Sequence, residues 1–200
     1  AFAIRDAKNG RLMLARDRVG IKPLYFTRDD DRLMFASTTQ ALLAADANID
    51  TSVDPFALHN LFSLHAVVPA PRTILKGIRK VRPAHYMVFH DDGRSEEQRY
   101  WALTARRPSK ALDENEWVEA IHDSLRRSVE RRLRIADVPV GVLLSGGIDS
   151  SLLVALLSEA GVKGLKTFSV GFEDQPEEKG NEFEYSDLVA ELYNTQHHRI

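Results

Sequence analysis

The residue types best suited to bind phosphate lie in one serine- and glycine-rich segment, Ser145-Gly146-Gly147-Ile148-Asp149-Ser150-Ser151. Two adjacent glycines let a backbone turn sharply and approach a ligand closely. A helix that follows them points unpaired N–H groups and the positive end of its dipole at the same spot. The alternative is a tight turn with a helix cap, because Asp and Ser both favour that position. We favour the first interpretation and call residues 145–151 the phosphate loop.

Electrostatics adds a cation to this prediction. A helix end carries about half a positive charge, which at about 4 Å and an effective dielectric near 20 attracts one phosphate charge by about 2 kcal/mol. That is too little to hold a triphosphate. Asp149 would also repel phosphate unless a hard cation lay between them, and a carboxylate together with phosphate oxygens is a typical ligand set for Mg²⁺. We therefore predict Mg²⁺ on Asp149. The sequence contains neither Gly-x-x-x-x-Gly-Lys-Ser/Thr nor Gly-x-Gly-x-x-Gly, the two commoner phosphate loops.

The elements around the loop predict how it is positioned. Residues 138–144 are short, apolar and β-branched, as in a buried strand, residues 151–157 indicate a helix, and residues 166–172 a second buried strand. Strand, helix and strand in this order predict a right-handed parallel crossover with the ligand at the carboxyl ends of the strands. Leu144 and Val170 end these strands, so we expect both to line an adenine pocket, although sheet core is an equally good interpretation of Val170. The predicted ATP-binding residues are Leu144, Ser145, Gly146, Gly147, Asp149, Ser150, Ser151 and Val170.

Further elements surround this unit. Asp113 and Glu116 resemble a capping box that opens a helix reaching about Arg134. Its apolar positions, which we expect in the core, are Trp117, Ile121, Leu125, Val129 and Leu133. The acidic composition of residues 173–182, with Pro176 and Gly180, predicts a loop of the kind that carries substrate specificity. A helix over 186–193 and a strand from residue 195 follow. We interpret His197 and His198 as structural residues rather than as metal ligands or a catalytic base, because adjacent residues of a strand face opposite ways.

The N-terminal half has the pattern of a β-rich domain. Residues 11–16, 24–26 and 32–36 predict a β-meander with a turn at Asp29-Asp30-Asp31. Asp54-Pro55 predicts the start of a short helix that ends at about Ser63. A strand over 85–90 ends in the hairpin signal Asp91-Asp92-Gly93.

Composition narrows the function classes. The 200 residues include 27 basic and 29 acidic side chains, a balance that argues against a nucleic-acid or membrane surface. We interpret the Arg-rich run 126–134 as a solvated helix face rather than a binding patch. No apolar run reaches transmembrane length. The absence of cysteine excludes disulfides and thiol nucleophiles within this sequence and fits a cytoplasmic protein.

The phosphate loop resembles the PP-loop of the N-type ATP pyrophosphatases, and the longer run 137–151 resembles the glutamine-dependent asparagine synthetases. The resemblance implies ATP and Mg²⁺ as cofactors. It also implies a parallel α/β domain in which a carboxylate is adenylated and then amidated with ammonia from glutamine.

A second resemblance lies in residues 15–25, Ala-Arg-Asp-Arg-Val-Gly-Ile-Lys-Pro-Leu-Tyr, which are similar to a signature of class II glutamine amidotransferase domains. On the residues alone this segment is a charge cluster and a turn. The family fold is an αββα (Ntn-type) sandwich, of which we expect the C-terminal half here. The family nucleophile is an N-terminal cysteine, which this sequence lacks, so we expect an internal fragment and assign no catalytic residue. We expect Arg16, Asp17, Gly20 and Lys22 to shape the fold and its face toward the second domain.

Together these patterns predict a mixed α/β and α+β chain of two partial domains. Residues 1–99 would form part of the glutamine amidotransferase domain, residues 100–112 a linker, and residues 113–200 the first part of the ATP-binding domain.

Two loop segments, residues 65–71 and 177–187, resemble the N-acetylglutaminylglutamine amidotransferases of this family. The resemblance implies glutamine, ATP and a dipeptide carboxylate as substrates, and it allows a homodimer. Aspartate is the alternative acceptor. From a different class, the chain could be a non-catalytic nucleotide-binding module, and we expect no turnover from this segment alone.

Overall fold

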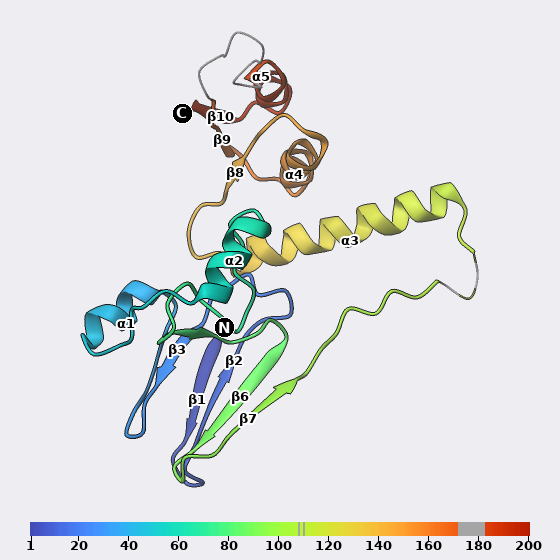
Figure 1. Ribbon diagram of the computed structural model, residues 1–200. Coiled ribbons are helices and arrows are strands. Elements are labelled where there is room, and N and C mark those ends of the chain that lie inside the picture. Colours follow the sequence, from blue (N-terminus) through green and yellow to red (C-terminus); the bar gives the residue numbers. More distant parts are fainter. Residues whose placement is uncertain (108, 110, 172–182) are drawn as a thin grey trace. The chain divides into compact units, whose positions relative to one another are not determined.

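The computed structural model describes residues 1–107, 109, 111–171 and 183–200, and the chain divides into two compact units, Ala1–Arg106 and Arg107–Ile200 (Figure 1). The division falls within the stretch that we expected to be a linker. The predicted acidic loop over 173–182 lies outside the described residues. No helix in the described part of the chain is long and apolar enough to cross a membrane.

The first unit is built on two antiparallel sheets with two short helices. The four-stranded sheet has the strand order β1-β2-β6-β7, and Figure 1 shows these four strands side by side. The three-stranded sheet has the order β4-β3-β5. The elements are β1 (Phe2–Asp6), β2 (Arg11–Ala15), β3 (Tyr25–Arg28), β4 (Leu33–Ala36), α1 (Thr39–Ala45), α2 (Pro55–Ser63), β5 (Arg79–Lys80), β6 (His85–His90) and β7 (Ser95–Arg99).

An apolar core joins the two sheets. It contains Leu14 of β2, Phe26 of β3 and Phe89 of β6, together with Leu24 and Val81. The rings of Phe26 and Phe89 meet edge to face with their centroids 5.7 Å apart. Because these side chains come from both sheets, the unit contains the two facing β layers that the resemblance implied. The remaining Ntn-type details of the sandwich stay a prediction.

The predicted β-meander is wrong at its first connection. β2 pairs with β1 and β6, whereas β3 pairs with β4 and β5 in the other sheet. The intervening segment, residues 16–24, carries the chain from one sheet to the other, which a strand pattern alone does not reveal. The other local predictions are confirmed. Asp29 Oδ1 accepts hydrogen bonds from the backbone N–H of Asp31 (2.9 Å) and Arg32 (2.7 Å) in the β3–β4 turn. α2 begins after Asp54, and β6 and β7 form the predicted hairpin.

The second unit is a parallel α/β arrangement, as predicted. Its sheet has the order β10-β9-β8, and both strand pairs are parallel. The elements are α3 (Glu114–Ile135), β8 (Gly141–Leu143), α4 (Ile148–Glu159), β9 (Lys166–Ser169), α5 (Phe183–Leu192) and β10 (Gln196–Arg199). The core contains Val142, Leu144 and Val154 with neighbours from α3, α4 and α5.

Burial alternates along the strands of this sheet. On one face Val142, Thr167 and Ser169 are buried, while on the other Leu143 is 76 % exposed. The predicted buried strand over 138–144 is therefore too long and too deeply buried. Successive strand residues point to opposite faces, and the described residues leave the Leu143 face open to solvent.

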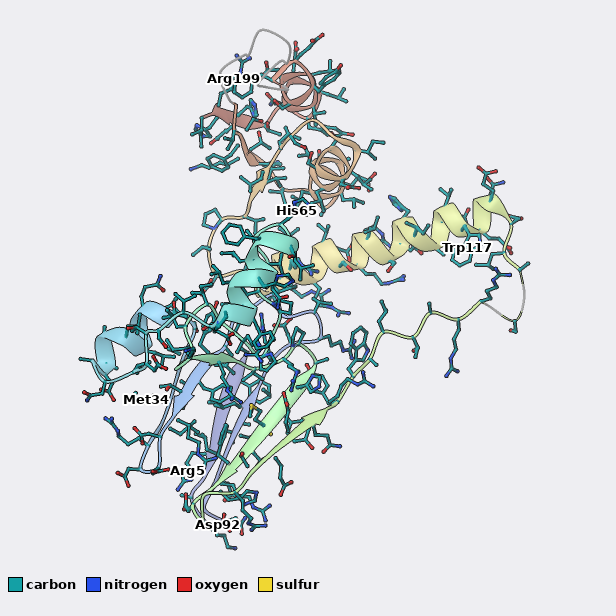
Figure 2. The ribbon with its side chains drawn as sticks, viewed as in Figure 1. Arg5, Met34, His65, Asp92, Trp117 and Arg199 are labelled. Atoms are coloured by element: carbon teal, nitrogen blue, oxygen red, sulfur yellow. The ribbon has the colours of Figure 1, made fainter. Side chains whose placement is uncertain are left out.

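The long helix α3 confirms its predicted start. Asp113 accepts a hydrogen bond from the N–H of Glu116 (2.8 Å), and the Glu116 side chain accepts one from the N–H of Asp113 (2.9 Å). Val129 is buried, as predicted. The prediction that Trp117 and Ile121 lie in the core is wrong, because their side chains are 45 % and 53 % exposed. A helix of this length spans about 33 Å, more than the small sheet covers, and Trp117 lies on the part of α3 far from α4 (Figure 2).

The Arg-rich run of α3 is a solvated face. Arg126 forms ion pairs with Asp123 (3.4 Å) and Glu130 (3.2 Å), and Arg127 approaches Asp123 at 3.8 Å. These pairs are exposed and lie three or four residues apart along the helix, where such contacts are weakly stabilising. The interpretation as a helix face is confirmed.

Candidate functional site

The phosphate loop joins β8 to α4 and leaves the start of α4 without a side-chain cap. Gly147 is the N-cap residue, with φ −70° and ψ 164°, and no side chain accepts a cap hydrogen bond there. In contrast, α1, α2 and α3 are capped by Thr38, Asp54 and Asp113. The capping role considered for Asp and Ser in this loop is therefore wrong. The N–H groups of the first turn of α4 are available to an anion.

Two serine hydroxyls hold the loop closed. Ser145 Oγ lies 3.1 Å from Ser150 Oγ, and the backbone N–H of Ser145 donates to Ser150 Oγ at 3.3 Å. Gly147 is bound on both sides, since its N–H donates to Ser145 Oγ (3.3 Å) and its carbonyl accepts from Ser150 Oγ (3.1 Å). Ser145 and Ser150 thus shape the loop from within. Contact with a phosphate stays a prediction for both residues.

Gly146 lies directly against the first turn of α5. Its φ is +82°, a backbone conformation that favours glycine. A Cβ built on Gly146 would lie 2.4 Å from Tyr185 Cβ and 2.7 Å from the backbone nitrogen of Ser186. The second glycine is open by comparison, because a Cβ on Gly147 would meet only Ser145 Oγ, at 3.4 Å. The sequence placed both glycines in the loop but gave no signal that α5 closes on one of them.

Asp149 is an exposed residue in the first turn of α4. Within the described ranges no group of three or more His, Asp or Glu side chains could hold a metal ion by itself. One carboxylate with phosphate oxygens is nevertheless a sufficient ligand set for Mg²⁺, which keeps several of its waters. The position of Asp149 therefore fits a cation that arrives with phosphate. Ser151, two residues on, has a buried hydroxyl with no partner among the residues that the structure describes.

Leu144 and Val170 differ from each other in burial. Leu144 is 1 % exposed and belongs to the core, its N–H donates to the carbonyl of Phe168 (2.8 Å), and its carbonyl accepts from the hydroxyl of Ser169. The Leu144 side chain therefore packs against the core of the second unit. Val170 directly follows β9 and is 57 % exposed, so the sheet-core interpretation of Val170 is wrong. That both residues contact a nucleotide stays a prediction.

A cluster of polar side chains around His197 was not predicted from the sequence. His197 lies between Thr167, 2.8 Å from Nδ1, and Ser169, 3.4 Å from Nε2. Asp187 Oδ1 is 3.5 Å from His197 Nε2 and also accepts from Arg199 Nε at 2.9 Å. Arg199 is labelled in Figure 2. His198 points the other way and stacks on Phe168 (5.1 Å between ring centroids). That both histidines are structural stays a prediction.

In the first unit, the segment with the amidotransferase-like signature is locked by two charged residues. The guanidinium of Arg16 donates to the carbonyls of Gly20 (2.8 Å), Val81 (2.9 Å) and Lys22 (3.1 Å). The carboxylate of Asp17 accepts from the N–H of Ile21 (2.8 Å) and Lys22 (3.1 Å). Partial burial raises the pKa of Asp17, but these N–H donors outweigh it and hold the pKa below its usual value. Arg16, Asp17 and Gly20 therefore shape the fold, as predicted, whereas Lys22 contributes through its backbone.

Comparison with known protein families divides the chain in the same way. Residues 1–101 match the glutamine amidotransferase domain family. Residues 120–200 match the asparagine synthase family.

Individual proteins similar to this chain carry both parts. The chain is 32 % identical to asparagine synthetase [glutamine-hydrolyzing] 3 of Bacillus subtilis, over 100 % of the chain and 33 % of that protein. It is 34 % identical to a putative asparagine synthetase [glutamine-hydrolyzing] 2 of Methanocaldococcus jannaschii, over 99 % of the chain and 38 % of that protein. Amidase chry2 of Gibberella zeae is 36 % identical over 83 % of the chain and 24 % of its own length. The chain thus spans about a third of the length of the first two relatives.

Proposed function

The chain belongs to the glutamine-dependent asparagine synthetase family, and on that premise we propose that the protein containing it is an ATP-dependent amidotransferase. It adenylates a carboxylate at the phosphate loop and amidates the activated carboxylate with ammonia released from glutamine. The reaction forms a carbon–nitrogen bond, and the products derived from ATP are AMP and pyrophosphate.

The observation that carries this proposal is that α4 begins without a side-chain cap, next to a phosphate loop that is held closed by Ser145 and Ser150. Gly147 leaves the first-turn N–H groups of α4 without a side-chain partner, and Ser145 and Ser150 lie 3.1 Å apart beside them. Adenylation moves negative charge onto the departing pyrophosphate. Preorganised N–H and O–H donors stabilise charge that develops in the transition state. We propose that Ser145, Gly146, Gly147, Ser150 and Ser151 bind this pyrophosphate, with Leu144 and Val170 next to the adenine.

The fit of Mg²⁺ rests on Asp149. Its carboxylate is exposed in the first turn of α4, where it would face the bound phosphates. Mg²⁺ held by Asp149 and phosphate oxygens would neutralise charge on the leaving pyrophosphate. Asp149 thereby becomes compatible with an anionic ligand that it would otherwise repel.

The first unit supplies the glutamine half of the proposal. Its two facing sheets and its match to the amidotransferase domain family support a glutaminase that feeds ammonia to the ATP site. We assign no nucleophile, because the N-terminal cysteine used by such domains is not in this sequence.

Two carboxylate acceptors are proposed. The first is an N-acetylated glutamine dipeptide, supported by the resemblance of residues 65–71, while the other supporting segment, residues 177–187, lies partly outside the described residues. The second is aspartate, supported by the names of the relatives in Bacillus subtilis and Methanocaldococcus jannaschii. A homodimer is compatible with either.

An ATP–pyrophosphate exchange assay on the full-length protein tests the function. We expect Mg²⁺-dependent exchange with N-acetylglutaminylglutamine and then formation of its amide when glutamine is added. Exchange with aspartate alone would replace the dipeptide proposal with the asparagine one. Nucleotide binding without exchange for either acceptor would leave only a non-catalytic nucleotide-binding module.

A further inference from the structure

One hydroxyl connects the buried polar cluster of the second unit to the phosphate loop. Ser169, the last residue of β9, is 4 % exposed, and its Oγ donates to the carbonyl of Leu144, the residue directly before the loop. The two residues are 25 positions apart in sequence. They are brought together because β8 and β9 pair in parallel with Leu143 beside Phe168.

The contact sets the orientation of a whole peptide group. The carbonyl of Leu144 and the N–H of Ser145 belong to one planar peptide unit, so neither can rotate without the other. The same N–H donates to Ser150 Oγ at 3.3 Å. A hydrogen bond to each end of this peptide plane therefore fixes the entry of the chain into the phosphate loop.

Behind Ser169, hydrogen bonds connect its hydroxyl through His197 to Thr167 and Thr195. Thr167 Oγ1 lies 2.8 Å from Thr195 Oγ1 and 2.8 Å from His197 Nδ1, and His197 Nε2 lies 3.4 Å from Ser169 Oγ. Because a carbonyl oxygen only accepts, the Ser169 hydroxyl donates to Leu144, and the oxygen of that hydroxyl is left to accept from the His197 ring. The only hydrogen that Ser169 has to donate is then committed to the Leu144 carbonyl.

We propose that Ser169 is a positioning residue, which orients the Leu144–Ser145 peptide so that the phosphate loop is preformed for ATP. The inference rests on the proposed function for its kinetic consequence. Its structural consequence, an ordered loop, does not depend on turnover. Loss of the hydroxyl would leave the buried Leu144 carbonyl with one donor fewer and let the peptide plane rotate.

The test compares two buried residues on the same strand and the same face of the sheet in the full-length protein. Ser169→Ala removes the hydroxyl that reaches the loop. Thr167→Val, the matched control, removes a hydroxyl that bonds Thr195 and His197 but not the loop. Ser169→Thr keeps the hydroxyl and should restore the behaviour of the wild type.

Amide hydrogen exchange of residues 144–151 is the first measurement. We expect it to be faster in Ser169→Ala and unchanged in Thr167→Val. The second is KM for ATP in the exchange assay, which should rise about tenfold in Ser169→Ala, the equivalent of one buried hydrogen bond.

Equal effects of Ser169→Ala and Thr167→Val on both measurements, or no effect of Ser169→Ala on loop exchange, would overturn the proposal. If wild-type protein shows no pyrophosphate exchange, the proposed function fails, while the hydrogen-exchange comparison still decides the role of Ser169. If Ser169→Ala does not fold, Ser169→Cys, similar in size but a weaker donor, replaces it. Ser169→Cys should then increase amide hydrogen exchange of residues 144–151, and unchanged hydrogen exchange would contradict the proposal.

Discussion

Gly146 packs so closely on the first turn of α5 that a Cβ on Gly146 would lie 2.4 Å from Tyr185 Cβ. The phosphate loop is therefore closed by an element that begins almost forty residues later in the chain. Since Gly146 also has a φ of +82°, both its backbone conformation and its surroundings exclude a side chain. The shape of the loop depends on α5 as much as on its own glycines.

Gly146→Ala should destabilise the second unit by about 2–5 kcal/mol. A left-handed backbone costs about 1–2 kcal/mol for a residue with a Cβ, and overpacking costs about 1–3 kcal/mol in addition. Urea unfolding of the full-length protein, followed by circular dichroism, measures the change.

Two other glycines separate these contributions. Gly161 has the same φ of +82° with nothing within 4 Å of its Cβ position, so Gly161→Ala should cost only the backbone part, about 1–2 kcal/mol. Gly147→Ala, with φ −70° and only Ser145 Oγ at 3.4 Å from its Cβ position, should cost about 0.5–1 kcal/mol, because alanine is a poorer N-cap residue than glycine. Equal losses in all three variants would contradict the packing of Gly146 on α5.

Asp149→Asn should abolish pyrophosphate exchange while leaving the circular dichroism spectrum unchanged. The substitution removes the carboxylate that would hold Mg²⁺ at an exposed position, where no packing is lost. Exchange measured across a range of Mg²⁺ concentrations is the test. Glu159→Gln, the same change of charge at the other end of α4, should keep normal exchange. An unchanged Mg²⁺ dependence in Asp149→Asn would remove the metal assignment.

Arg16→Ala should lower the free energy of unfolding of the first unit by about 2–4 kcal/mol. Three backbone carbonyls, of Gly20, Lys22 and Val81, lose their charged donor together. Arg18→Ala is the control, because Arg18 is exposed and lies 5.5 Å from the ring of Trp101, and it should cost less than about 1 kcal/mol. Similar losses for the two variants in thermal or urea unfolding would show that Arg16 does not lock the segment.

Asp54 should make the stability of the first unit depend on pH. Burial raises the pKa of Asp54, but the Arg72 guanidinium and the N–H groups of Ala57 and Phe56 lower it more, so its pKa lies below the usual value. Such a carboxylate stabilises the fold above its unfolded pKa, near 3.9, and the contribution is lost as pH falls through the folded pKa.

Asp54→Asn isolates this effect, because Asn is an equally good N-cap residue without the charge. The loss of stability in the variant should be largest at neutral pH and should shrink below about pH 4. Urea unfolding over this range is the measurement, and Arg72→Gln should weaken the same pH dependence. A difference between wild type and Asp54→Asn that stays constant with pH would refute the prediction.

Local patterns in the sequence were enough for the elements that carry the site. The apolar run before Gly146 and Gly147 predicted a strand, and the parallel crossover to β9 was predicted correctly. Asp54 and Asp113 predicted the starts of α2 and α3. These features depend on residues that are neighbours in the chain, so composition and spacing reveal them.

Packing between distant segments was not predictable in the same way. The separation of β2 and β3 into different sheets depends on the path of residues 16–24, and the exposure of Trp117 on the size of the sheet that α3 covers. Neither is encoded in a window of neighbouring residues.

The sequence by itself determined that Ser145 to Ser151 lie where a strand gives way to a helix, and phosphate binding by this segment stays a prediction. Only the tertiary structure decided that α5 closes on Gly146 and that Ser169 holds the Leu144 carbonyl. The physical reason is that these contacts require strand register and helix packing to bring together atoms from segments far apart in the chain. Such contacts form only when the whole unit has folded.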